Sequence, residues 1–218
     1  MTTENKLFGE NDIDILEEVM KHRRDVRGNR FTNDPVSDEV IDKILTAALY
    51  APSVGFSQPW EFVVIRDENT KSKVVETFNE ENEKAARLFT DDRHTQYLNL
   101  RLEGITAAPV NIAVFYTPND VPVLGQTSMA EVGPYSVVCA VQNMWLMARA
   151  LNIGIGWVSI LDPERVKQVL HAPQGHQLIA YLCVGYVNSF LDKPELELKR
   201  WEQRKLRNKV VLRESYKP

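Results

Sequence analysis

The sequence predicts an α+β fold with three layers, in which helices cover both faces of a central sheet. Its 218 residues are enough for one substantial domain with its own core. Short runs of β-branched and aromatic residues alternate loosely with amphipathic helical segments, and no repeat or low-complexity linker divides the chain. We therefore expect four strands and about six helices, with residues 1–218 forming a single domain.

The elements expected in the first half follow from periodicity and from helix start and stop signals. Ser37 is a suitable helix cap, and Pro52 ends the apolar face that follows it. The expected elements are a helix over 12–22, a helix from Ser37 to Leu49, a loop over 51–59, a strand over 60–65 and a charge-rich helix over about 70–90.

The second half continues with alternating elements. We expect a break at Asp91-Asp92, a helix over 96–107, a strand over 110–116, a long loop over 117–132, a helix over 134–151, a strand over 154–160, a short helix capped by Asp162 and a strand over 178–187. Apolar residues nearly surround the helix over 134–151, which predicts burial inside the domain or at a subunit interface. From residue 188 onward the chain has too few apolar residues for a core of its own.

The composition is typical of an ordinary soluble globular protein, with 44% hydrophobic residues, 26% charged residues and a net charge of -4. A basic excess that would indicate nucleic-acid binding is missing. The N-terminus lacks the apolar run of a signal peptide, and no segment approaches the roughly 20 apolar residues that span a bilayer. We expect a cytoplasmic protein with neither a nucleic-acid nor a membrane partner.

Cysteine and histidine usage predicts neither a disulfide framework nor a metal site. Cys139 and Cys183 stand among apolar neighbours, as buried free thiols do. His171 and His176 are separated by a proline and a glycine, which favours a surface loop over a pair of metal ligands.

The segment from Arg23 to Arg27 places three arginines around one aspartate, directly after the first helix. Guanidinium groups match the geometry of a phosphate, so the cluster indicates a phosphorylated ligand. A solvated charge run at a helix C-terminus is the alternative interpretation. Asp25 opposes the charge of a phosphate and must therefore face something else.

Other motifs are weaker when each is taken alone. Gly154 and Gly156 lack the third glycine of a dinucleotide fingerprint, and they open a strand rather than follow one. The loop from Ser53 to Pro59 can be a simple helix stop. The hydroxyl of Ser159 can be satisfied by neighbouring backbone rather than serve chemistry.

Taken together and in order, these segments resemble the FMN-dependent nitroreductase family over nearly the whole chain. The matching motifs are the arginine cluster, with Asp25 where serine is usual, the loop segments Ala51-Pro52-Ser53 and Gln58-Pro59-Trp60, and the strand over Gly156–Leu161. The resemblance implies a three-layer sandwich with a mixed, mostly antiparallel sheet. It also implies a homodimer with the flavin at the interface and residues 188–218 packed on the partner subunit.

The resemblance further implies which residues contact FMN. The arginines and a basic residue near the C-terminus would bind the phosphate, and the loop and strand residues would contact the ribityl chain and the ring. The implied FMN-binding residues are Arg23, Arg24, Asp25, Val26, Arg27, Ser53, Gln58, Pro59, Asn99, Arg101, Ser159, Leu161, Arg200 and Arg204.

Within that family, the motifs resemble the flavin destructase branch most. They occur here at Arg23–Arg27, Gly55–Phe62, Leu102–Asn111 and Gly156–Pro163. This resemblance implies that reduced FMN is the substrate, which dioxygen helps to cut into 5,6-dimethylbenzimidazole, the lower ligand of cobalamin, and erythrose 4-phosphate. It implies no metal, and a separate flavin reductase as the source of reduced FMN.

The same resemblance makes Asp25 and Ser159 the predicted catalytic residues. An ionised Asp25 can take a proton as a general base, which a serine in its place cannot do at neutral pH. Ser159 can donate a hydrogen bond to the flavin. The alternatives are an NAD(P)H-dependent FMN nitroreductase or flavin reductase, which recycles its flavin, and a flavin-binding or storage module, which has no need of Asp25.

Overall fold

Four strands form one sheet in the computed structural model, which describes residues 5–216. The strands are β1 (Trp60–Ile65), β2 (Val110–Tyr116), β3 (Gly154–Val158) and β4 (Gln177–Gly185). They lie in the order β1-β2-β4-β3, and each neighbouring pair is antiparallel. All four predicted strands are confirmed, β1 and β2 with the predicted bounds.

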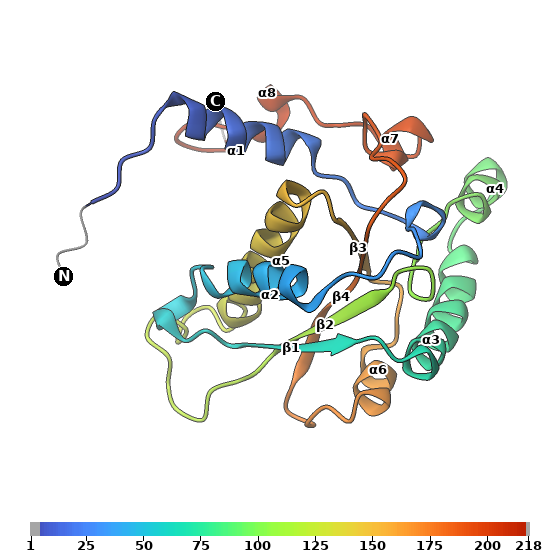
Figure 1. Ribbon diagram of the computed structural model, residues 1–218, viewed down its shortest axis with the longest axis horizontal. Helices are drawn as coiled ribbons and strands as arrows, with labels where there is room; N and C mark the ends of the chain where they lie inside the picture. Colours follow the sequence, from blue (N-terminus) through green and yellow to red (C-terminus); the bar gives the residue numbers. More distant parts are fainter. Residues whose placement is uncertain (1–4, 217–218) are drawn as a thin grey trace.

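Helices cover both faces of this sheet, which confirms the predicted three layers (Figure 1). Helices α2 (Asp38–Leu49) and α5 (Val132–Ala150) lie on one face, and α3 (Glu68–Ala86) and α6 (Pro163–Val169) lie on the other. The period of two along β2 explains why two cores form. Ile112 and Val114 pack with α2 and α5, whereas Ala113 and Phe115 pack with α3 and α6.

The remaining helices lie outside these layers. They are α1 (Glu10–His22), α4 (Asp91–Leu98), α7 (Glu195–Leu198), α8 (Arg207–Val210) and the 3₁₀ turns η1 (Gly28–Arg30) and η2 (Val54–Phe56). The predicted caps are confirmed, because the side chains of Ser37 and Asp162 accept backbone N–H groups at the starts of α2 and α6.

A short parallel contact extends the sheet beyond β3 and carries the arginine cluster. Asp25 forms a parallel bridge with Ile155, and the N–H of Val26 donates to the carbonyl of Ile155 over 3.0 Å. A Cβ at Gly156 would lie within 3.0 Å of the Val26 carbonyl oxygen, closer than real Cβ atoms come. Glycine at position 156 therefore allows the segment 25–27 to lie against β3.

The predicted helix over 96–107 is wrong, and the predicted break at Asp91-Asp92 lies at residues 87–90 instead. Helix α4 begins at Asp91 and ends at Leu98, and residues 100–107 contain only turns and irregular backbone. Two contacts explain the difference. The N–H of Gly28 donates to the Glu103 carbonyl over 2.8 Å, and a Cβ at Gly104 would lie 2.8 Å from the Phe31 ring. The segment packs flat against residues 28–31, which a helix would prevent.

The prediction that both thiols are buried holds for Cys183 and is wrong for Cys139. Cys183 lies in the core of the sheet, whereas Cys139 is exposed on α5. The reason is that α5 is buried along one side only. Its outer side leaves Tyr135 and Val138 exposed, at 55% and 40%. Among the described residues, no helix combines the length and the apolar character that crossing a bilayer requires.

Candidate active site

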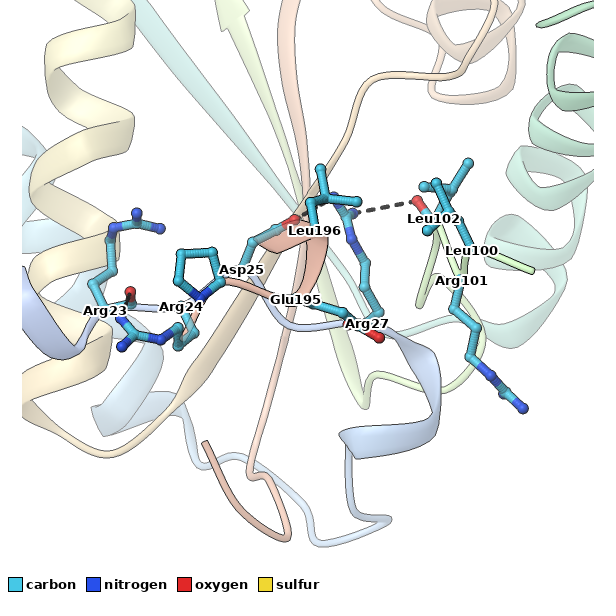
Figure 2. A pocket seen from close by; sticks show the side chains of 10 residues that line it. Arg23, Arg24, Asp25, Arg27, Leu100, Arg101, Leu102, Glu195 and Leu196 are labelled. Atoms are coloured by element: carbon cyan, nitrogen blue, oxygen red, sulfur yellow. Dashed lines mark hydrogen bonds and ion pairs between the residues drawn. The ribbon is translucent and has the colours of Figure 1, made fainter. Parts of the chain in front are cut away.

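A cavity of about 150 Å³ lies beside the end of α1, where the segment 23–27 passes β3. Three parts of the chain far apart in sequence form its walls (Figure 2). The lining residues are Arg23, Arg24, Asp25, Arg27, Leu100, Arg101, Leu102, Pro194, Glu195 and Leu196. The fold therefore gathers the predicted arginine cluster around one hollow.

Asp25 is fixed in this cavity through both of its carboxylate oxygens. The backbone N–H of Trp157 on β3 donates to Oδ1 over 3.0 Å, and the Arg27 guanidinium forms an ion pair with Oδ2. Burial of the carboxyl raises its pKa above the ordinary value of 3.8, and Arg27 and the N–H group of Trp157 oppose this rise. The side chain keeps 36% exposure, so Asp25 is accessible to a ligand.

Arg27 connects Asp25 to two neighbouring segments. Its Nη1 donates to the carbonyl oxygens of Leu102, over 3.2 Å, and Trp157, over 3.0 Å. Figure 2 shows Arg27 on one side of Asp25, with Arg23 and Arg24 on the other. Because its N–H groups serve the carboxylate and two carbonyls, Arg27 orients Asp25.

Arg24 is committed to backbone carbonyls rather than to the cavity. It is 8% exposed, and it donates to the carbonyl oxygens of Lys21, Arg23, Leu191 and Asp192. A guanidinium group has five N–H donors, and these four contacts use most of them. Arg24 therefore joins the end of α1 to the C-terminal tail.

Arg23 is the arginine of the cluster whose donors are available. Within residues 5–216 its guanidinium makes no hydrogen bond, and it stacks over the Trp145 ring at 4.6 Å. Burial lowers its pKa from 12.5, and Asp25 opposes this change. Arg23 and Arg204 both line a second cavity of about 640 Å³, next to the first. Arg200 does not line this cavity.

Ser159 and Leu161 follow the end of β3, and neither residue lines either cavity. Ser159 is exposed, two residues beyond Trp157, whose backbone holds both Asp25 and Arg27. The side chains of Leu161 and Val26 are buried in the core that α3 and α6 cover. Contact of either residue with a ligand would therefore use backbone atoms.

The loop with Ser53, Gln58 and Pro59 lies apart from the cavity in the same chain (Figure 1). Ser53 is the acceptor for the N–H of Gln58 over 3.0 Å, and the Pro59 carbonyl accepts the N–H of Thr117. None of these three residues lines either cavity. Within one subunit, the structure does not bring this predicted part of the site to the arginines.

Two further predicted residues are placed less favourably for ligand contact. The amide of Asn99 donates to the Thr95 carbonyl over 2.9 Å at the end of α4. Arg101 lines the cavity, but its guanidinium points away from the cluster in Figure 2.

The sequence did not reveal several of the groups that surround Asp25 and the arginines. The contacts of Trp157 and Leu102 are made by backbone atoms, which leave no trace in residue type. Glu195 comes from a polar tail whose path cannot be read from periodicity. Trp145 offered a weak signal, because an aromatic ring on a buried helix is a common partner for arginine.

The described part of the chain, residues 5–216, contains no group of three or more histidine, cysteine, aspartate or glutamate side chains that could hold a metal ion. The ionisable groups at the cavity are the arginines, Asp25 and Glu195. This set fits an anionic organic ligand with one region that exchanges protons.

The fold and this arginine-lined cavity agree with a flavoprotein class. The chain belongs to the nitroreductase family, whose sequence profile matches residues 20–186. A relative of known function is the 5,6-dimethylbenzimidazole synthase of Rhodospirillum rubrum. It is 39% identical over 201 residues, which cover 91% of this chain and 94% of the relative.

Two other proteins extend the comparison. The 5,6-dimethylbenzimidazole synthase of Rhodobacter capsulatus is 35% identical over 90% of this chain and 95% of its own. The crystal structure of an iodotyrosine deiodinase bound to FMN and 3-iodo-L-tyrosine superimposes with a TM-score of 0.71. It is 21% identical and covers 92% of this chain and 98% of that chain, so it shows a shared fold.

Proposed function

We propose that this protein is a 5,6-dimethylbenzimidazole synthase, which uses dioxygen to fragment reduced FMN into 5,6-dimethylbenzimidazole and erythrose 4-phosphate for cobalamin synthesis. The observation that carries the proposal is an aspartate held between the Trp157 N–H and Arg27, in a chain 39% identical to such a synthase. Reduced flavin and dioxygen supply the oxidative chemistry, and the chain supplies binding and proton transfer.

The phosphate of FMN fits best between Arg23 and Arg204. Both line the larger cavity, and neither guanidinium has a hydrogen-bond partner among residues 5–216. Two guanidinium groups can hold a phosphate by charge-assisted hydrogen bonds. Arg24 and Arg27 then act as positioning residues, because their donors are committed to the tail and to Asp25. Arg204, rather than Arg200, is the C-terminal arginine of this site.

Asp25 is the proposed general base. Its Oδ2 faces Arg27 and its Oδ1 accepts the Trp157 N–H, so the carboxylate is oriented before a ligand binds. A raised pKa makes an aspartate a stronger base once it is ionised. The hydroxyl of Ser159, an exposed residue just beyond β3, is the proposed hydrogen-bond donor to the flavin.

A homodimer completes the site in this proposal. The loop with Ser53 and Gln58 lies apart from the arginines of its own chain, and a second copy can present it to them. Exposed apolar side chains on α1 and α5 provide a surface to bury. Those side chains are Ile13, Leu16, Met20, Tyr135 and Val138. Light scattering coupled to gel filtration tests this, and a monomer at micromolar concentration would overturn it.

Tail residues 191–201 contact their own subunit, through Arg24 at one end and through Trp201 at the other. Packing of the tail on a partner subunit is therefore proposed for the exposed residues 202–216.

The decisive experiment mixes the purified protein with chemically reduced FMN in air and detects the benzimidazole by chromatography with fluorescence. We expect product without NADPH, and product with oxidised FMN only when a flavin reductase and NADPH are added. Yellow protein that oxidises NADPH rapidly and forms no product would instead indicate a nitroreductase or flavin reductase. Tight flavin binding without either reaction would indicate a binding module.

A further inference from the structure

Trp145 of α5 contacts the arginine cluster at two points. The Arg23 guanidinium lies over the face of the indole, with its Cζ 4.6 Å from the ring centroid. The indole Nε1 donates to the carbonyl oxygen of the next residue, Arg24, over 3.2 Å. One side chain therefore holds both the side chain of Arg23 and the backbone that follows it.

The place of Trp145 in the fold makes it a firm support for these contacts. Its neighbours on α5, Met144 and Ala148, are buried in the core that α2 and α5 cover, and the Trp145 side chain packs against that core. The Trp157 ring of β3 lies 6.3 Å from the Trp145 ring, centroid to centroid. Helix α5 and strand β3 therefore meet at two tryptophans beside the arginine cluster.

A guanidinium that lies over a ring keeps its hydrogen-bond donors available. Its N–H groups point outward in its own plane, whereas the ring contacts only its face. Arg23 makes no hydrogen bond within residues 5–216, so these donors can serve a ligand. The donors of Arg24, by contrast, are occupied by four backbone carbonyls. Trp145 thus holds Arg23 without using the groups that a phosphate needs.

The ring also offsets the repulsion between neighbouring cations. Burial lowers the pKa of Arg23, Asp25 raises it, and the charges of Arg24 and Arg204 lower it further. Arg23 and Arg204 line the same cavity, where like charges repel. The negative face of an indole attracts a guanidinium. This attraction keeps Arg23 at the cavity before an anion binds.

We propose that Trp145 is a positioning residue that gives the site its preference for a phosphorylated flavin, because it holds the Arg23 guanidinium with its N–H groups free for the phosphate. The inference rests on the proposed function, in which Arg23 and Arg204 bind the phosphate of FMN. It adds that selection of FMN over riboflavin, which lacks the phosphate, depends on a residue that acts through Arg23.

Binding of oxidised FMN and of riboflavin, measured by quenching of flavin fluorescence, tests this role without turnover. The ratio of the two dissociation constants isolates the contribution of the phosphate. Wild type should prefer FMN, and Trp145→Met should lower that preference about threefold or more while riboflavin binds nearly as before. Trp145→Phe keeps an aromatic ring and should retain most of the preference. The matched control is Phe190→Met, which removes the ring beneath Arg149, an arginine that lines neither cavity.

Arg23→Gln shows whether Trp145 acts through Arg23. This substitution alone should lower the preference for FMN, and adding Trp145→Met to it should lower the preference no further, because the two residues act as one unit. A preference that Trp145→Met leaves unchanged, or lowers by the same factor with and without Arg23, would overturn the inference.

A fluorinated tryptophan tests the contact with the ring retained. The face of 5,7-difluorotryptophan is less negative, so its incorporation at all four tryptophans should lower the preference for FMN in wild type and leave it unchanged in Arg23→Gln. Equal effects in the two proteins would count against Trp145.

Failure of this inference and failure of the proposed function give different results. Absence of product from reduced FMN and dioxygen would overturn the proposed function, while the binding ratios still decide the role of Trp145. A wild-type protein that binds FMN and riboflavin equally would overturn both the phosphate site and the inference.

Discussion

The backbone N–H of Trp157 donates to Oδ1 of Asp25 over 3.0 Å, across a sequence separation of 132 residues. The same tryptophan accepts a hydrogen bond from Arg27 through its carbonyl oxygen. One peptide segment of β3 therefore orients both the proposed base and the arginine that pairs with it.

Asp25→Asn should abolish product formation while FMN still binds. Asparagine retains an oxygen that can accept the Trp157 N–H, but it cannot take a proton, and loss of a general base lowers rates by about 100-fold or more. Product is measured by chromatography and binding by quenching of flavin fluorescence. Asp25→Ser, which also removes the carboxylate, should be equally inactive. Near-normal turnover by Asp25→Asn would show that another group is the base.

Ser159→Gly should lower product formation and release oxidised flavin instead. Ser159 is exposed just beyond β3, and removing its hydroxyl leaves the proposed flavin contact without a donor. The ratio of benzimidazole to oxidised FMN measures how the flavin is partitioned between the two outcomes. Ser159→Thr keeps a hydroxyl and serves as the control. An unchanged ratio in Ser159→Gly would remove Ser159 from the mechanism.

Gly156→Ala should lower both stability and activity. The new methyl group would collide with the Val26 carbonyl oxygen and displace the segment that carries Asp25. Overpacking of this kind costs about 1–3 kcal/mol in the free energy of unfolding. At Gly175 the nearest neighbour of an added Cβ is Pro118, at 4.0 Å, so Gly175→Ala should change stability by no more than about 0.5 kcal/mol. Equal urea midpoints for the two variants would contradict the close approach at Gly156.

The elements with strong periodicity could be predicted from the sequence. The bounds of β1 and β2 followed from β-branched and aromatic runs between clear breaks, and the caps of α2 and α6 from Ser37 and Asp162. The failure over 96–107 has a tertiary cause. Gly104 and Glu103 lie against residues 28–31, and no local pattern reports that contact.

The candidate site, like the fold, could be predicted from the sequence only in part. Arginine and aspartate side chains carry chemical information, so the cluster from Arg23 to Arg27 was visible in the sequence. Its internal roles were not visible, because they depend on carbonyl groups supplied by the tail and by residues 100–102. The commitment of Arg24 to Leu191 and Asp192 shows how a residue of the right type can serve structure instead of ligand binding.

The pH dependence of stability provides a test of Asp25 that needs no ligand. Burial raises the pKa of this carboxyl above 3.8 in the folded protein, so the folded state retains a proton at pH values where the unfolded chain has lost it. A folded state that binds more protons loses stability as pH rises, here from about 3.8 up to the raised pKa. Asp25→Asn removes this titration.

Asp25→Asn should therefore gain stability relative to wild type as pH rises through that window, and the difference in the free energy of unfolding between the two proteins should stay constant below it. Urea unfolding at closely spaced pH values between about 3 and 7 measures the difference. Asp14→Asn, on the exposed surface of α1, is the control for loss of an acidic charge alone. A difference that moves in the opposite direction would mean that the Arg27 ion pair and the Trp157 hydrogen bond outweigh burial, and that Asp25 is ionised at lower pH than in the unfolded chain.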